Sequence, residues 1–154
     1  MNAPQPVPSQ EEITAKMTAV LDAQRQDYLK EGCVTAESRI DRLDRGIDTV
    51  LKHQHKLVEA LNSDFGCRSR QVSLLTDIAA AVTPMKHAKK QLRHWMKGQK
   101  RPTMFPLNLM GGRSTIEYQP LGVIGVISPW NFPVNLTFGP LAGILAAGNR
   151  AMIK

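Results

Sequence analysis

The chain has 154 residues, of which 42% are hydrophobic and 21% charged, enough apolar material for the core of one ordinary domain. This composition excludes a disordered or fibrous protein, and no apolar run reaches the roughly 18–20 residues that a membrane-spanning helix needs. The first residues lack the basic and apolar regions of a secretory signal, so we expect a cytoplasmic protein with no membrane partner.

The net charge of +7 is concentrated in one short segment. Residues 86–101 hold seven lysines and arginines and no acidic residue, and five of the seven share one helical face: Lys86, Lys89, Lys90, Arg93 and Lys97. Such a face binds nucleic-acid phosphates or meets acidic groups of a protein. The segment has a single aromatic side chain, Trp95, and lacks the stacked aromatics of single-strand binders, so we do not expect a nucleic-acid partner.

Helical periodicity dominates residues 13–98, after a segment of residues 1–12 that we expect to be flexible. Ser9 and Glu12 form a capping-box pattern at the start of the first helix, and Gly32 ends it. A second helix begins near Thr35 and ends at residues 62–66. Its apolar stripe repeats at helical spacing: Ile40, Leu43, Ile47, Val50, Leu51, Leu57, Val58 and Leu61.

A third helix runs from about Ser69 and should kink or split at Pro84, because proline lacks a backbone donor and disfavours helix just before itself. Its expected apolar face consists of Val72, Leu75, Ile78, Ala79 and Val82. These stripes predict helix packing and carry no chemistry. The two cysteines and four histidines lack the spacing of a disulfide framework or a metal site, so no metal is expected.

The pattern changes after Gly98. Residues 99–119 predict an extended, Gly- and Pro-rich connection followed by a half-exposed strand at Ser114–Tyr118. Residues 120–154 predict one βαβ unit: a β-branched strand at 123–127, typical of burial on both faces, a helix at 135–147 and a strand from Ala151. The expected fold class is therefore α/β, with N-terminal helices followed by the first βαβ unit of a Rossmann-like nucleotide-binding domain.

The loop Ser128–Pro133 is the candidate site, because ligands of open α/β sheets bind outside the carboxyl ends of the strands, beside helix N-termini. Its two prolines favour extended geometry in the residues before them and so stiffen the loop. Asn131 offers an uncharged carboxamide with two N–H donors, which suits a developing oxyanion. The residues alone leave open the simpler interpretation that Asn131 satisfies nearby backbone groups.

Three motifs, in their order and spacing, resemble the start of the cofactor domain in aldehyde dehydrogenases. They are Pro120-Leu121-Gly122, Pro129-Trp130-Asn131-Phe132-Pro133 and Ala146-Ala147-Gly148-Asn149, with Lys154 closing the match. The runs Asn135-Leu136-Thr137 and Arg39–Leu43 resemble the class 3-like branch of the family. Within that branch, Asp64–Ser69 resembles the bacterial coniferyl aldehyde dehydrogenases.

The resemblance implies oxidation of an aldehyde, coniferyl or another aromatic aldehyde, to the carboxylic acid, with NAD or NADP as cofactor and a homodimer as the assembly. Asn131 would donate a hydrogen bond to the oxygen of the thiohemiacetal. The residues implied to contact the cofactor are, on the nicotinamide side, Ile127, Ser128, Pro129 and Trp130, and, at the adenosine ribose, Lys154.

The family's glycine-rich turn, glutamate base and cysteine nucleophile come later in its order and are absent from this sequence. Cys33 and Cys67 lie in the helical region without a positioned base and do not replace that nucleophile. The resemblance therefore implies the N-terminal part of a dehydrogenase, inactive by itself. Two alternatives stay open: a short non-catalytic module that pairs with full-length dehydrogenase subunits, partly through Ser114–Tyr118, and a basic helical nucleic-acid binder that uses residues 86–101.

Overall fold

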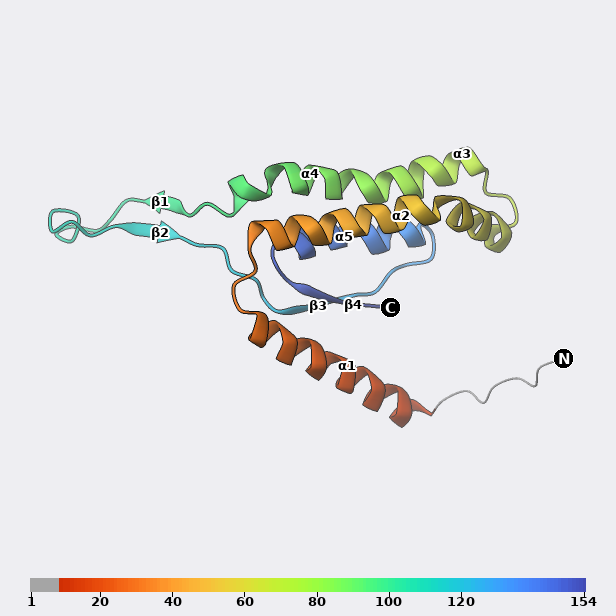
Figure 1. Ribbon diagram of the computed structural model, residues 1–154, viewed down its shortest axis with the longest axis horizontal. Helices are drawn as coiled ribbons and strands as arrows, with labels where there is room; N and C mark the ends of the chain where they lie inside the picture. The colour runs from red at the N-terminus through yellow and green to blue at the C-terminus, as the bar shows by residue number, and fades with distance from the viewer. Residues whose placement is uncertain (1–8) are drawn as a thin grey trace.

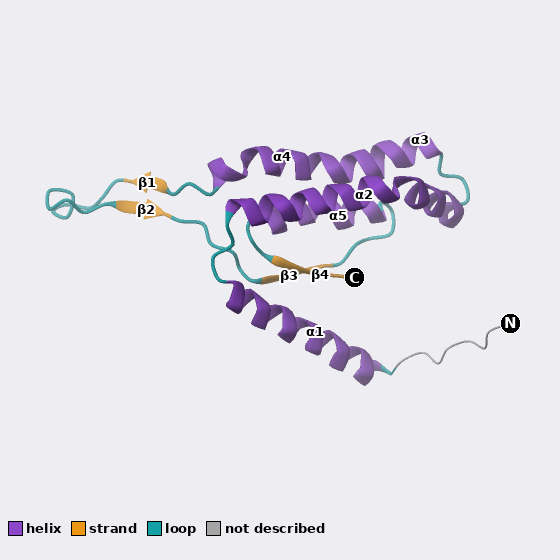
Figure 2. Cartoon of the chain, in the orientation of Figure 1, coloured by secondary structure: helices purple, strands orange, loops and turns teal. Residues whose placement is uncertain are grey.

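A computed structural model describes residues 9–154, and it confirms the expected fold class of helices followed by a βαβ unit (Figure 1). Figure 2 shows how helix dominates the first two thirds of the chain. The helical part contains α1 (Gln10–Glu31), α2 (Ala36–Phe65), α3 (Arg70–Ser73), the π-helical η1 (Leu74–Ala79) and α4 (Ala80–Trp95). A hairpin of β1 (Gln99–Arg101) and β2 (Ser114–Ile116) follows, and then β3 (Val123–Val126), α5 (Pro133–Ala146) and β4 (Arg150–Ile153).

Local signals set the ends of α1. The Ser9 hydroxyl accepts from Glu12 N at 3.2 Å, and the Glu12 carboxylate accepts from Ser9 N at 2.8 Å, which is the expected capping box. The helix ends at Gly32, whose N–H donates to Tyr28 O. Residues 1–8 of the segment predicted to be flexible lie outside the described residues, whereas residues 10–12 already belong to the helix.

The core lies between α2, α4 and α5. Most of the predicted α2 stripe is buried there, and Met85 of α4 is fully enclosed. Leu51 is an exception, since 37% of it is exposed. The buried members of the predicted stripe are Leu43, Ile47, Val50, Val58 and Leu61.

The predicted face of the third helix is wrong at Val72, Leu75 and Ala79, all of which are exposed. Val72 and Leu75 are 47% and 71% exposed, and Ser73 and Asp77 are buried in their place. The reason is η1: a π-helical turn takes more residues than an α-helical turn, so the inward face shifts along the chain. The helix also continues unbroken through Pro84, and its irregularity lies just before this proline.

The parallel ribbon of β3 and β4 lies between α5 and α1 (Figure 1). α1 reaches it through Gln24 Nε2, which donates to Ala151 O at 3.1 Å, and Tyr28 Oη, which donates to Pro120 O at 3.3 Å. The expectation of burial on both faces is not met among residues 9–154, because this sheet has two strands and α1 contacts it at few points. Val126 is the buried residue of β3.

The hairpin of β1 and β2 extends away from the helices (Figure 1). The strands pair antiparallel with Gln99 opposite Ile116, so the segment predicted as an extended connection begins with a paired strand. The loop between them exposes a group of large apolar side chains: Met104, Phe105, Leu107, Leu109 and Met110.

Candidate active-site loop

The loop that follows β3 starts beside the carboxyl end of β4. Parallel pairing continues past both strands, since Lys154 N donates to Val126 O at 2.9 Å and Ser128 N donates to Lys154 O at 2.9 Å. The structure therefore brings Ser128 and Lys154 together at the end of the sheet where ligands of α/β proteins bind. The Lys154 side chain is exposed there.

Two hydroxyl groups close the loop onto the start of α5. Ser128 Oγ donates to the Pro133 carbonyl at 3.0 Å, and Thr137 Oγ1 donates to the same carbonyl at 2.6 Å. Pro133 is the first residue of α5, a position that suits proline because the N–H there has no partner within the helix. The Ser128 hydroxyl is thus engaged in holding the loop.

The side chains in the middle of the loop face solvent. Ile127 is 84% exposed and Trp130 is 87% exposed, and Pro129 and Asn131 are also exposed. The backbone of Asn131 is bonded, but its carboxamide makes no hydrogen bond to the residues that the structure describes. Its N–H donors are therefore free to meet a ligand oxygen.

Two residues whose roles the sequence did not reveal hold the loop from the side of the helices. The Arg68 guanidinium donates through Nη2 to Asn131 O at 2.6 Å and through Nη1 to Asp77 Oδ2 at 3.2 Å. It also lies over the rings of Phe65 and Phe132, at 4.0 and 4.9 Å from their centroids. Arg68 lies inside a motif that carries the resemblance to coniferyl aldehyde dehydrogenases, but Asp77 lies in no recognisable pattern.

Asp77 occupies the N-terminus of α5. Its carboxylate is fully buried, and Oδ1 accepts from Val134 N at 3.2 Å and from Asn135 N at 3.3 Å. The first amides of this helix are therefore already bonded to an anion of the protein. The charge of Asp77 would oppose a phosphate group at these amides.

The motifs that carry the family resemblance touch one another in space. Asn149 Oδ1 accepts from Leu121 N at 2.6 Å and from Gly122 N at 2.9 Å, which joins the turn before β3 to the turn before β4. Arg39 is buried and donates through Nη1 to Ala146 O at 3.0 Å, at the C-terminal end of α5. A cation at that end is stabilised by the helix dipole.

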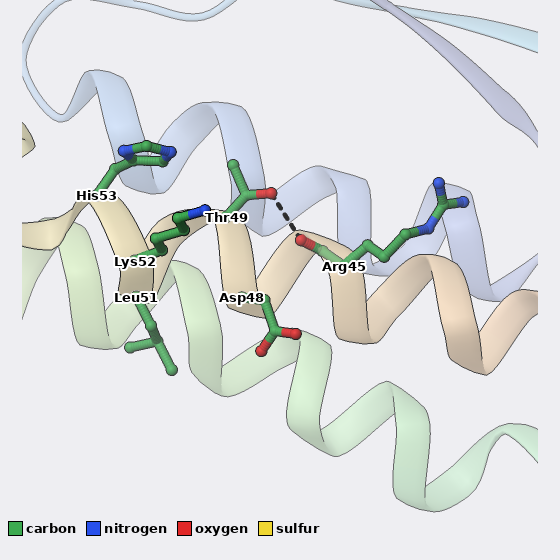
Figure 3. A pocket seen from close by; sticks show the side chains of 6 residues that line it. All are labelled: Arg45, Asp48, Thr49, Leu51, Lys52 and His53. Atoms are coloured by element: carbon green, nitrogen blue, oxygen red, sulfur yellow. Dashed lines mark hydrogen bonds between the residues drawn. The ribbon is translucent and has the colours of Figure 1, made fainter.

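A surface hollow along α2 offers no alternative site. Figure 3 shows that all the side chains lining it come from this one helix, with Thr49 Oγ1 donating to Arg45 O at 2.7 Å. Its lining residues are Arg45, Asp48, Thr49, Leu51, Lys52 and His53. Across residues 9–154 there is no cluster of three or more His, Cys, Asp or Glu side chains that could hold a metal ion, and none of the helices there is long and apolar enough to cross a membrane.

The basic face of α4 meets acidic residues of α2. Lys89 Nζ lies 2.7 Å from both carboxylate oxygens of Asp44, and Arg93 Nη1 lies 2.8 Å from Glu37 Oε1. The pKa of Glu37 is lowered by a hydrogen bond from its own backbone and by Arg93. These pairs favour a structural role for the basic face over binding of nucleic-acid phosphates.

The sequence and the structure both match known proteins over most of the chain. The sequence profile of the Aldehyde dehydrogenase family matches residues 6–154. A probable coniferyl aldehyde dehydrogenase of Caulobacter vibrioides is 50% identical over all of this chain and 32% of its own length, and a coniferyl aldehyde dehydrogenase of a Pseudomonas species is 45% identical over 90% of the chain and 28% of its own length. The chain thus spans about a third of these relatives.

Solved structures agree with the sequence matches. AldH of Staphylococcus aureus in a substrate-bound state superposes with a TM-score of 0.76 at 28% identity, over 84% of this chain and 28% of its own. An NAD-dependent benzaldehyde dehydrogenase of Corynebacterium glutamicum superposes with a TM-score of 0.74 at 27% identity, over 90% of this chain and 28% of its own. The chain therefore belongs to the aldehyde dehydrogenase family.

Proposed function

We propose that the chain forms the N-terminal part of an NAD(P)-dependent aldehyde dehydrogenase, in which the Asn131 carboxamide stabilises the oxyanion that forms when the aldehyde carbonyl is attacked. The observation that carries this proposal is an exposed carboxamide without a partner among the described residues, at the carboxyl ends of two parallel strands in a chain of this family. Donors aimed at a developing oxyanion are worth about 10²–10³ in rate each. Among residues 9–154, neither Cys33 nor Cys67 makes a hydrogen bond to a base, and this segment by itself is expected to be inactive.

The same loop would hold part of the nicotinamide cofactor. Ile127 and Trp130 offer exposed apolar surface for the nicotinamide ring, with Ser128 and Pro129 between them. The Lys154 ammonium, at the end of the neighbouring strand, would donate to hydroxyl groups of the adenosine ribose. When bound, the cofactor would supply the acceptor for a hydride from the substrate carbon, and these residues would orient it and exclude water from one side. The proposal covers both NAD and NADP.

The proposed substrate is an aromatic aldehyde such as coniferyl aldehyde. Two relatives named for that aldehyde are similar to the chain over nine tenths of its length or more, and one structural neighbour is named for benzaldehyde. A cytoplasmic location also stays a prediction from the sequence.

The proposal is tested on the complete protein that carries this segment. Reduction of NAD and of NADP is followed by absorbance with coniferyl aldehyde, benzaldehyde and an aliphatic aldehyde. Asn131→Ala should lower kcat about 10²–10³-fold. The matched control is Gln26→Ala, which removes an exposed carboxamide on α1 and should leave kcat unchanged. No aldehyde-dependent reduction by the wild type would refute the proposal, and an unchanged kcat in Asn131→Ala would refute the role of that residue.

The exposed hairpin loop favours a second candidate function, association with dehydrogenase subunits. Met104, Phe105 and Met110 are 77%, 73% and 79% exposed, and large apolar side chains grouped this way are typical of protein interfaces. A homodimer of the complete protein, or a short module bound to longer subunits, would cover them. The intact mass in the natural source separates the two, since a short module would have a mass near 17.1 kDa. If the complete protein sediments as a monomer, and Phe105→Asp does not change its sedimentation, both forms of association are refuted.

A further inference from the structure

We propose that Arg68 and Asp77 are positioning residues that hold the loop carrying Asn131 in the geometry needed to bind the oxyanion. This inference rests on the proposed function, because it assigns to two helical residues the task of orienting the proposed oxyanion donor. Neither side chain belongs to the loop. Arg68 is joined to it by a hydrogen bond, and Asp77 is joined to the first amides of α5, directly after it.

The Arg68 guanidinium makes contacts in three directions at once. Its Cζ atom lies over the rings of Phe65 and Phe132, Nη1 donates to Asp77, and Nη2 donates to the carbonyl of Asn131. The side chain is 13% exposed, so water competes weakly for these bonds. A planar group with several fixed donors can hold this arrangement, whereas a lysine ammonium cannot stack on a ring and bridge two acceptors in the same plane.

Asp77 anchors the start of α5, directly after the loop. A fully buried carboxylate is costly unless it is paired and hydrogen-bonded, and here Arg68 and the first amides of α5 supply both. The π-helical turn of η1, which contains Asp77, shifts this residue onto the inward face. Turns of this kind are frequent at functional sites.

The two anchors act at the proposed donor and just after it along the chain. Arg68 holds the carbonyl of Asn131 itself, and Asp77 holds the amides of Val134 and Asn135. The Asn131 carboxamide stays free of such bonds within the described residues. Because a misplacement of about 1 Å can cost about 10²-fold in rate, rigid anchoring of this backbone has a direct catalytic consequence.

The test compares Arg68→Lys with Arg70→Lys in the complete protein. Arg68→Lys keeps a cation beside the buried Asp77 but loses the planar fork, whereas Arg70 forms an exposed ion pair with Glu59 and serves as the matched control. We expect Arg68→Lys to lower kcat about 10–10²-fold, and Arg70→Lys to leave it unchanged. Asp77→Asn, which removes the charge and keeps an acceptor oxygen, should behave as Arg68→Lys does.

A double-mutant cycle separates positioning from a general structural role. If Arg68 acts through Asn131, then Arg68→Lys should have no further effect on kcat in an Asn131→Ala background. Equal fold-losses in the two backgrounds would overturn the inference, and so would a kcat unchanged by Arg68→Lys.

Hydrogen exchange gives a measurement that does not depend on activity. In Arg68→Lys, peptides that contain residues 127–136 should exchange faster, because Asp77, which accepts from the amides of Val134 and Asn135, loses the planar guanidinium that holds it in place. Peptides of the α2 core should not change. Unchanged exchange in 127–136 would overturn the inference. Faster exchange in residues 127–136 of a protein without aldehyde-dependent activity would support the anchoring and refute the proposed function. Failure of the anchoring and failure of the proposed function therefore give different results.

Discussion

An alanine in place of Gly148 tests how tightly the turn between α5 and β4 is packed. Gly148 has a φ of 83°, and a Cβ atom at this position would lie 2.8 Å from Arg39 Cζ and 2.9 Å from Arg39 Nε. The guanidinium cannot retreat freely, since Arg39 is 6% exposed and donates to Val34 O and Ala146 O, each at 3.0 Å. The substitution therefore strains the backbone and displaces a buried cation.

The free energy of unfolding should fall by about 2.5–5 kcal/mol. The left-handed backbone costs alanine about 1–2 kcal/mol. Displacing Arg39 breaks at least one hydrogen bond of a charged group, worth about 1.5–3 kcal/mol. Gly66→Ala is the matched control, because Gly66 has a φ of 70° and no atom within 4 Å of the added carbon. That control carries the backbone cost alone, about 1–2 kcal/mol.

Equilibrium unfolding in urea, followed by circular dichroism, measures both variants against the wild type. The difference between the two variants measures the cost of displacing Arg39. Equal losses for Gly148→Ala and Gly66→Ala would refute that cost, because the contact with Arg39 would then contribute nothing.

Three further predictions concern the core, the turn before β3 and the loss of stability at acidic pH. Met85→Ala should lower the free energy of unfolding by about 2–5 kcal/mol, because Met85 is fully buried. Met104→Ala, at a residue 77% exposed, should change the free energy of unfolding by less than about 0.5 kcal/mol. Equal urea midpoints for the two variants would contradict this prediction. Asn149→Ala should cost about 1–3 kcal/mol in the same assay, because the buried amide of Gly122 loses its acceptor, and a neutral result would mean that water replaces it. The folded-state pKa of Glu37 lies below its ordinary value of 4.5, so its contribution to stability is present above that pH and is lost as the pH falls through the folded pKa. Glu37→Gln should therefore flatten the fall of the urea midpoint below pH 4.5, and parallel profiles for the two proteins would contradict the assignment.

The sequence by itself determined the elements whose causes are local. The capping box at Ser9 and the glycine at position 32 set the ends of α1, because each acts on a helix end within a few residues. The apolar stripe of α2 predicted its buried face, since one regular period covers the whole helix. The run Val123–Val126 and the turn at Gly148 predicted the βαβ unit, and with it the position of the Asn131 loop.

The tertiary structure decided the features that depend on distant groups. The inward face at Asp77 follows from a π-helical turn, which a search for 3.6-residue periodicity cannot detect. β1 forms because Gln99 pairs with Ile116 across a long loop, and no pattern within its three residues requires a strand. Arg68 reaches the carbonyl of Asn131, 63 positions away along the chain, because the end of α2 and the start of α5 pack against the same helical run. The sequence thus identified the candidate oxyanion donor, whereas the side chains that orient its loop became visible only through folding, which brings distant residues into hydrogen-bond range.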